Sequence, residues 1–168
     1  SEPLKVYASG NQNVNHLDED YDGKTPDILD NAFVIVDFEN GVRALLDLCM
    51  FAENSDYQEE LCAVGSIGKI ETAVPSNYSG ILISDVRIGL RKRENAKKET
   101  IAVDEKIHAA GHHHGSTFYE HQSFIKAIRS NSLPEVSLND GLVAVAIGEA
   151  AEISIKEGRV VQMSELNL

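Results

Sequence analysis

The chain has 168 residues, 42% of them hydrophobic and 25% charged, with a formal net charge of −12. This length and composition indicate a single soluble domain large enough to bury a hydrophobic core. No apolar run approaches the ~20 residues that cross a bilayer, and the first ten residues lack the pattern of a signal peptide. The negative charge disfavours nucleic acid and anionic membranes as partners.

The acidic charge is concentrated in the first part of the chain. Residues 1–60 carry 14 acidic and three basic side chains, whereas residues 61–168 carry 13 and 12. Residues 10–31 form a polar segment that is long for a simple connection, which favours a binding loop or an interface arm. The acids around His16 lack the spacing of a calcium loop, so we expect a solvated acidic surface there and no metal site.

The clearest local signal is a β-hairpin that follows a first strand. We expect the first strand over Leu4–Ser9, with Leu4, Val6 and Ala8 on one face. Residues 32–38 and 42–51 are β-rich runs joined by Glu39-Asn40-Gly41, and Asn-Gly tolerates the positive φ of a tight turn. The second run has one wholly apolar face and one mixed face. We therefore expect helices on one face of the sheet and another surface over part of the other.

Further strands are expected at Tyr57–Val64, at Lys69–Val74 and within residues 81–103. Six basic residues fall within residues 87–98, but no aromatic residues interleave with them. We interpret these bases as a hairpin tip and not as a nucleic-acid patch. Cys49 and Cys62 lie in apolar strand patterns, which predicts two buried free thiols in a reducing cytoplasm, with a disulfide between neighbouring strands as the alternative.

Two helices are expected late in the chain. Residues 117–130 begin with a capping box of Thr117 and Glu120, and residues 138–157 begin at Ser137 and Asp140. Gly158 ends the second helix, and a short strand over residues 159–163 follows. Strands that precede helices without βαβ alternation predict an α+β fold: an open, mostly antiparallel sheet with two C-terminal helices packed on one face.

Three consecutive histidines, His112, His113 and His114, precede the first of these helices and are flanked by glycines. The positive end of the helix disfavours imidazolium, so we expect neutral rings at pH 7. Such rings offer hydrogen bonds to a hydroxyl- or carboxylate-bearing ligand, but they supply no reaction by themselves. His108 and His121 are weaker candidates for the same role.

Two other interpretations of the histidines remain open. One or two of the rings can point inward as core groups while the third is simply exposed. Alternatively, two of them plus Glu120 can form a zinc or nickel site, although adjacent histidines diverge on an extended backbone and need a third ligand supplied by the fold.

Several motifs in the same order resemble the C-terminal domain of the glucose–fructose oxidoreductase/inositol dehydrogenase/MocA (Gfo/Idh/MocA) family. They are SEPLKVYASG, DNAFVIVDFENGVRALLDL, VGSIGKIET and GHHHGSTFYEHQSFIKAIRSNSLPEVSLNDGLVAVAIGEAAEISIKEGRVVQMSEL, and together they span essentially all of residues 1–168. The resemblance implies that the chain is a substrate-binding and oligomerisation domain. It also implies an N-terminal Rossmann domain, absent from this chain, that binds NAD or NADP.

The resemblance also implies what this chain lacks. The sequence has no G-x-G-x-x-G after a strand, and no lysine in the Glu-Lys-Pro setting of the family's catalytic lysine. The family's Asp-and-His pair would precede Ser1. We therefore expect no catalytic residue, no cofactor bound by this chain and no activity from the isolated chain. The family acts on secondary alcohols of sugars or polyols, and His112, His113 and His114 are the candidate substrate-binding residues.

The resemblance also implies partners. The family's open sheet packs against another subunit, so a homo-oligomer formed through the sheet face is expected. The alternative to a dehydrogenase domain is a non-catalytic interaction module that dimerises through this sheet.

Overall fold

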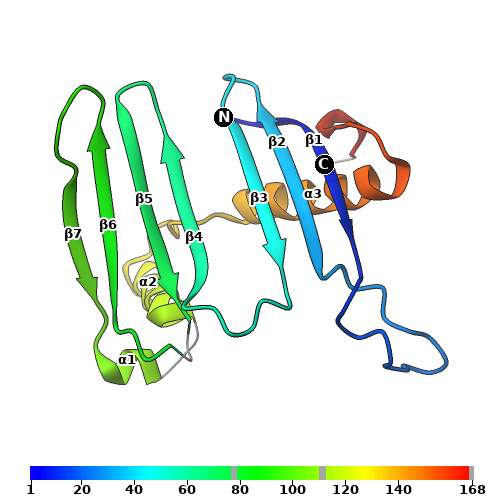
Figure 1. The fold of residues 1–168 in the computed structure, drawn as a ribbon, viewed down its shortest axis with the longest axis horizontal. Helices are drawn as coiled ribbons and strands as arrows, with labels where there is room; N and C mark the ends of the chain where they lie inside the picture. Colours follow the sequence, from blue (N-terminus) through cyan, green and yellow to red (C-terminus); the bar gives the residue numbers. More distant parts are fainter. Residues whose placement is uncertain (77–78, 110–112, 167–168) are drawn as a thin grey trace. The chain divides into compact units, whose positions relative to one another are not determined.

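The computed structural model describes residues 1–76, 79–109 and 113–166. The chain forms two compact units, Ser1–Glu53 with Val136–Leu168, and Asn54–Glu135. Each unit is built on a four-stranded antiparallel sheet (Figure 1). Within the described residues, no helix is both long and apolar enough to span a membrane.

The sheet of the first unit has the strand order β3-β2-β1-β8. Its strands are β1 (Pro3–Asn11), β2 (Asn31–Phe38), β3 (Arg43–Cys49) and β8 (Val161–Gln162). The turn between β2 and β3 contains Asn40 and Gly41, and Gly41 adopts a φ of 81°. The expected hairpin is confirmed by the antiparallel pairing of β2 with β3, and of Asn40 and Gly41 only Gly41 adopts a positive φ.

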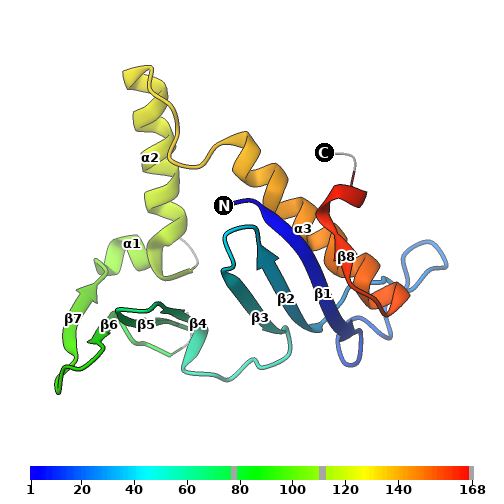
Figure 2. The same ribbon diagram turned by 90° about the horizontal axis from the view of Figure 1, so that it is seen from above.

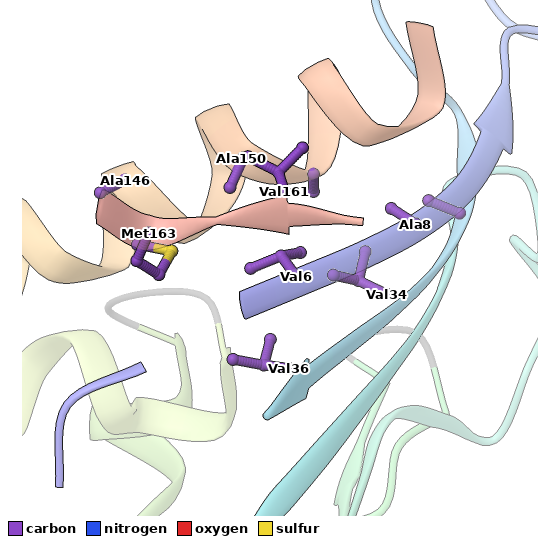
Figure 3. Close-up of a cluster of buried hydrophobic side chains, with 10 residues drawn as sticks. Val6, Ala8, Val34, Val36, Ala146, Ala150, Val161 and Met163 are labelled. Carbon is purple, nitrogen blue, oxygen red and sulfur yellow. The ribbon is translucent and has the colours of Figure 1, made fainter. Parts of the chain in front are cut away.

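Helix α3 (Leu138–Glu157) lies across one face of this sheet, above β1 (Figure 2). Small side chains at Ala146 and Ala150 let the helix backbone approach the strand closely, and both are essentially buried. They pack with the residues that Figure 3 labels, namely Val6, Ala8, Val34, Val36, Val161 and Met163. Alternate residues of β1 and β2 therefore form the core, as the period of a half-covered strand requires.

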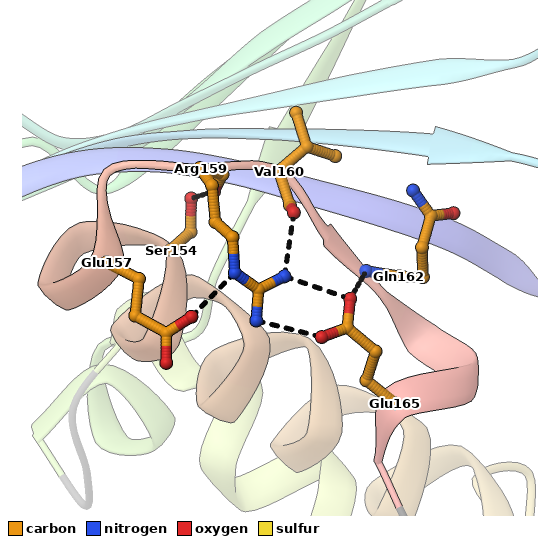
Figure 4. Close-up of polar contacts among 6 residues, drawn as sticks. All are labelled: Ser154, Glu157, Arg159, Val160, Gln162 and Glu165. Atoms are coloured by element: carbon orange, nitrogen blue, oxygen red, sulfur yellow. Dashed lines mark hydrogen bonds and ion pairs between the residues drawn. The ribbon is translucent and has the colours of Figure 1, made fainter.

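Polar contacts close the end of α3 onto the sheet (Figure 4). Ser154 Oγ accepts the N–H of Ala8 at 2.9 Å and donates to the carbonyl of Arg159 at 2.5 Å. The Arg159 guanidinium bonds both Glu157 (2.6 Å) and Glu165 (3.0 and 2.8 Å). Glu165 in turn accepts the backbone N–H of Gln162 at 2.7 Å. This network fixes the turn that brings β8 back beside β1.

Two details of the first unit differ from expectation. A β-bulge shifts the register between Pro3 and Lys5, so Leu4 is 46% exposed and Pro3 takes the buried position. The grouping of Leu4 with Val6 and Ala8 was therefore wrong. On β3, Leu46 is 53% exposed although it shares the helix-covered face, because β3 is an edge strand and α3 packs chiefly on β1.

The second unit has the strand order β4-β5-β6-β7. Its strands are β4 (Tyr57–Val64), β5 (Gly68–Pro75), β6 (Ile83–Leu90) and β7 (Lys97–Ala102). After β7 come α1 (Glu105–Ala109), a 3₁₀ turn η1 (His113–Gly115) and α2 (Ser116–Ser130). The strands and helices agree with the expected α+β class, although the strands divide between two sheets.

Two further expectations fail. Helix α2 begins at Ser116 with Gly115 as N-cap and no side-chain cap, so the capping box of Thr117 and Glu120 was wrong. Thr117 already lies in the first helical turn, and the preceding left-handed Gly115 leaves no extended cap residue. Cys49 and Cys62 are exposed free thiols and not buried ones, because β3 and β4 are edge strands and their sides are uncovered.

Candidate functional site

The segment between β7 and α2 builds the candidate site. Asp104 starts α1, because its carboxylate accepts the N–H of Lys106 at 2.8 Å and its carbonyl accepts the N–H groups of Ile107 (3.0 Å) and His108 (2.9 Å). This arrangement satisfies donors that the start of a helix leaves free. It holds His108 at a defined position five residues before the 3₁₀ turn.

The approach to α2 is made by three successive residues with left-handed backbone. His113, His114 and Gly115 have φ values of 56°, 54° and 85°. A side chain at Gly115 would also lie 3.0 Å from methyl carbons of Val103 and Ile107. Glycine is therefore needed at this position for both backbone and space, and the tight turn sends the two histidine rings into different surroundings.

His113 is the accessible histidine, with half of its side chain exposed. Its Nδ1 lies 3.0 Å from Nε2 of Gln58 and 3.3 Å from Oε1 of Glu59, both on β4. The shorter contact favours the tautomer in which Nδ1 accepts the Gln58 amide N–H and the ring proton lies on Nε2. In that tautomer the Nε2–H has no hydrogen-bond partner among the described residues, and Glu59 places a carboxylate beside the ring.

His114 is turned inward and is 8% exposed. Its ring meets the ring of His108 edge to face, with centroids 5.4 Å apart and an interplanar angle of 81°. Within the described residues, both ring nitrogens of His114 lack a hydrogen-bond partner, and so does Nε2 of His108. Burial, and then the neighbouring His108, lowers the pKa of His114. His114 is therefore neutral at pH 7 as expected, but burial is the main cause and not the helix end.

The remaining histidine candidates divide as follows. His112 lies outside the described residues. His121 is on α2, where its Nδ1 is 2.9 Å from the carbonyl of Thr117 one turn earlier, so that nitrogen is used locally. Across the described ranges, no group of three or more His, Cys, Asp or Glu side chains is placed to hold a metal ion.

Sequence reasoning missed Gln58 and Glu59, which hold the ring of His113. They lie 55 and 54 residues away in the chain, and β4 carries no local motif that distinguishes them. A bulge between Tyr57 and Glu59 shifts the pairing of β4 with β5 at this point. Bulges commonly re-aim a side chain next to a functional site, and no sequence pattern available here marks this one.

A separate hollow of about 720 Å³ runs along α2. Its lining combines polar side chains with two bases, Lys126 and Arg129. The other lining residues are Tyr119, Gln122, Ser123, Ile125, Ser130 and Glu135. Neither His113 nor His114 lines it, so the accessible His113 and this hollow are two distinct features of the second unit.

The fold defines a class: an α+β domain built on two antiparallel sheets, without a nucleotide-binding βαβ unit among its described residues. The family model "Oxidoreductase family, C-terminal alpha/beta domain" matches residues 3–163. The chain therefore belongs to the C-terminal domain family of the Gfo/Idh/MocA oxidoreductases. A search of curated proteins finds no match.

Solved structures of oxidoreductases share the fold. A levoglucosan dehydrogenase in complex with NADH and levoglucosan is 18% identical, with a TM-score of 0.69, over 96% of this chain and 45% of that one. An Agrobacterium radiobacter oxidoreductase in complex with NAD⁺, L-tartaric acid and magnesium is 18% identical, with a TM-score of 0.67, over 98% and 44%. An aldose-aldose oxidoreductase of Caulobacter crescentus complexed with glycerol is 17% identical, with a TM-score of 0.63, over 96% and 41%. The chain spans less than half the length of each.

The described residues do not fit a dinucleotide. Both sheets are antiparallel, so neither has the crevice at the carboxyl ends of parallel strands where a dinucleotide's phosphates meet a helix N-terminus. No step of hydride transfer can therefore be assigned to these residues. His113 and Glu59 place an imidazole ring and a carboxylate side by side at the surface of the second unit.

Proposed function

We propose that this chain is the substrate-binding and oligomerisation domain of an NAD(P)-dependent oxidoreductase that acts on a secondary alcohol of a sugar or polyol. The reaction then needs an N-terminal Rossmann domain to hold NAD or NADP, and the isolated chain is inactive. Family membership over residues 3–163 carries the proposal. Similar structures that carry NADH with levoglucosan, or glycerol, support the cofactor and the class of substrate.

Within that role, His113 is the residue we assign to the substrate. Its Nε2 donates to a substrate hydroxyl while Gln58 orients the ring through Nδ1. Glu59 lies beside the ring and accepts a hydrogen bond from the same or a neighbouring hydroxyl. Paired donors and acceptors of this kind suit adjacent hydroxyl groups, which offer both functions. His112 and His114 remain candidates with less support, because His112 lies outside the described residues and His114 is buried.

The division of labour between domains can be tested by titrating NADH into the 168-residue chain and into the full-length protein. We expect saturable fluorescence quenching with the full-length protein and none with the 168-residue chain. Correct folding of the chain is checked by its circular dichroism and cooperative unfolding. Saturable NADH binding by the folded 168-residue chain would refute the proposal.

A second candidate function is an interaction module that dimerises through its sheet, and one observation favours it. The face of the first sheet opposite α3 carries exposed apolar side chains at Tyr7, Phe33, Ile35 and Leu45, which are 45% to 68% exposed. Exposed apolar patches of this kind mark interaction surfaces. The same face is what the dehydrogenase proposal uses for oligomerisation, so the two candidates differ in turnover and not in assembly.

Leu45→Glu in the full-length protein separates these candidates. Both predict a shift towards monomer in sedimentation velocity, because the charge would be buried in a subunit contact. The dehydrogenase proposal also requires NAD(P)-dependent turnover of a polyol panel by the unsubstituted full-length protein. Absence of turnover with every sugar and polyol, together with loss of assembly in Leu45→Glu, would favour the interaction module.

A further inference from the structure

Two strongly charged, exposed segments of opposite sign remain without a role. The first is the basic tip, defined as Arg91, Lys92 and Arg93 at the β6–β7 turn with the apolar Val64, Ile67 and Leu90. The second is the acidic arm, residues 16–28, in the connection between β1 and β2. The basic tip belongs to the second unit and the acidic arm to the first.

The basic tip combines free positive charge with apolar surface. Arg91, Lys92 and Arg93 are exposed, and none has an ion-pair partner among the described residues. Further along β7, Lys97 and Lys98 are already paired with Glu99 and Asp85. The tip therefore has three cations available for an outside partner.

Backbone and apolar contacts give the tip a fixed shape. The N–H of Arg91 donates to the carbonyl of Ile67 at 2.7 Å and so joins the β6–β7 turn to the β4–β5 turn. This bond places Ile67, which is 75% exposed, next to the three bases. Val64 and Leu90 at the adjoining strand ends are 75% and 49% exposed. The result is a surface that combines exposed bases with exposed apolar side chains.

The acidic arm is ordered by its own contacts. Nδ1 of His16 lies 2.7 Å from Oε1 of Glu19, and the backbones of Tyr21 and Lys24 exchange hydrogen bonds of 2.8 and 3.2 Å. At its base the carboxylate of Asp30 accepts the N–H groups of residues 13–15, at 2.6 to 3.0 Å. A preorganised arm loses little conformational entropy when it docks.

The acidic arm leaves the complementary groups unused. Asp18, Asp22 and Asp27 are exposed and have no hydrogen-bond or ion-pair partner among the described residues. Leu17 and Tyr21 beside them are 52% and 64% exposed. The arm thus presents three free anions and two apolar side chains. The basic tip presents three free cations and three apolar side chains.

We propose that the basic tip is a docking surface for the acidic arm of a second copy of this chain. Opposite charges on preorganised surfaces align the two copies, and contact between their exposed apolar side chains displaces water. Each copy carries one tip and one arm, so each copy can supply either side of the contact. A nucleic acid is a poor occupant of the tip because the chain carries a net charge of −12.

The experiment is sedimentation velocity of the chain carrying Leu45→Glu, which removes the contact proposed for the sheet face, at about 20 mM and about 500 mM salt, where screening lengths differ severalfold. We expect self-association at low salt that weakens at high salt. Arg91→Glu/Arg93→Glu should weaken the dimerisation constant about tenfold or more, and Asp18→Lys/Asp27→Lys should do the same. These positions avoid the left-handed Lys92 and Asp22, so the turns are kept.

The decisive measurement mixes the tip variant with the arm variant. A reversed tip on one copy faces a reversed arm on the other, while the remaining unaltered tip and arm also pair. We therefore expect the mixture to associate about as tightly as the chain without the tip and arm reversals, although each variant alone associates about tenfold more weakly. Lys126→Glu/Arg129→Glu on α2 makes the same change of net charge as the tip variant and should leave association unchanged.

Three results would overturn the proposal. The first is a chain that stays monomeric at low salt. The second is self-association that the tip and arm reversals leave unchanged, which would assign it to another surface. The third is a mixture of the two variants that fails to associate. In that mixture every proposed charge contact is restored, so a failure would mean that these charges do not hold the copies together.

Discussion

The two units differ in what they bury. Among the described residues, the first unit holds an aliphatic core under α3, whereas the second unit buries no Val, Leu, Ile, Phe or Met side chain. The second unit does bury His114, whose ring nitrogens have no hydrogen-bond partner among the described residues. Its neighbours His113 and Gly115 have left-handed backbone. Such features cost stability and occur at functional sites. The comparison indicates that the first unit supplies most of the aliphatic burial, whereas the second holds the residues to which we assign ligand binding.

Overpacking the contact between α3 and β1 should have the largest effect on stability. Ala150 is fully buried, so Ala150→Leu forces the helix away from the strand. We expect it to lower the free energy of unfolding by about 3 kcal/mol in urea denaturation. Ala144 is on the same helix but exposed, and Ala144→Leu should change stability by less than about 0.5 kcal/mol. Equal effects of the two variants would contradict the assignment of the core to this face.

The hydroxyl of Ser154 should rank second. Ser154→Ala leaves the buried N–H of Ala8 without its acceptor and the carbonyl of Arg159 without its donor. We expect a loss of about 2 kcal/mol in the free energy of unfolding. Ser130→Ala, which removes a hydroxyl that bonds its own helix carbonyl at an exposed position, is the control and should be near neutral. A neutral Ser154→Ala would show that water replaces the hydroxyl.

The two helix starts offer a smaller and more local comparison. Ser137 and Asp140 form a capping box on α3, with Ser137 Oγ accepting the N–H of Asp140 at 3.2 Å. Ser137→Ala should cost about 1 kcal/mol in thermal or urea unfolding, whereas Thr117→Ala at the uncapped start of α2 should cost clearly less. A larger loss from Thr117→Ala than from Ser137→Ala would indicate that Thr117 caps α2 after all, and would contradict the structure.

The smallest expected effect is a dependence of stability on pH that comes from His114. Its pKa is lowered in the folded chain, so the unfolded state takes up a proton first as the pH falls below about 6.5. The stabilising contribution of neutral His114 is therefore complete above that pH. It declines as the pH falls from about 6.5 to the lowered pKa of the folded chain. Urea unfolding between pH 7 and 5 should show this decline, and His114→Asn should reduce the slope. An unchanged slope would mean that the His114 ring titrates normally.

Much of the fold could be predicted because its signals are local. Asn40-Gly41 fixed the hairpin, and Ser137 with Gly158 marked both ends of α3. The failures came from effects that depend on distant residues. The exposure of Cys49 and Cys62 follows from which strands lie at sheet edges, and the bulge at Leu4 follows from pairing with β2. Neither can be read from a strand's own pattern.

The candidate site was predictable as a place but not as an arrangement. Three adjacent histidines between glycines drew attention to the turn before α2, yet sequence could not say which ring faces outward. That depends on the left-handed backbone of His113 and His114 and on Gln58 and Glu59 from β4. Sequence could not show that Asp30 is buried either, because its partners come from other parts of the chain. Burial raises the pKa of Asp30, but hydrogen bonds from the N–H groups of residues 13–15 and from Asn31 lower it to about 2.

The measurement that tests the central claim most directly is the effect of His113→Asn on kcat/KM and on stability in the full-length protein. Asparagine accepts the left-handed backbone of this position, so the fold should be kept. We expect kcat/KM for the polyol substrate to fall about tenfold, as for one lost hydrogen bond, with the unfolding midpoint unchanged. His121→Asn, whose ring bonds its own helix, should leave both unchanged. An unaltered kcat/KM in His113→Asn would contradict the account.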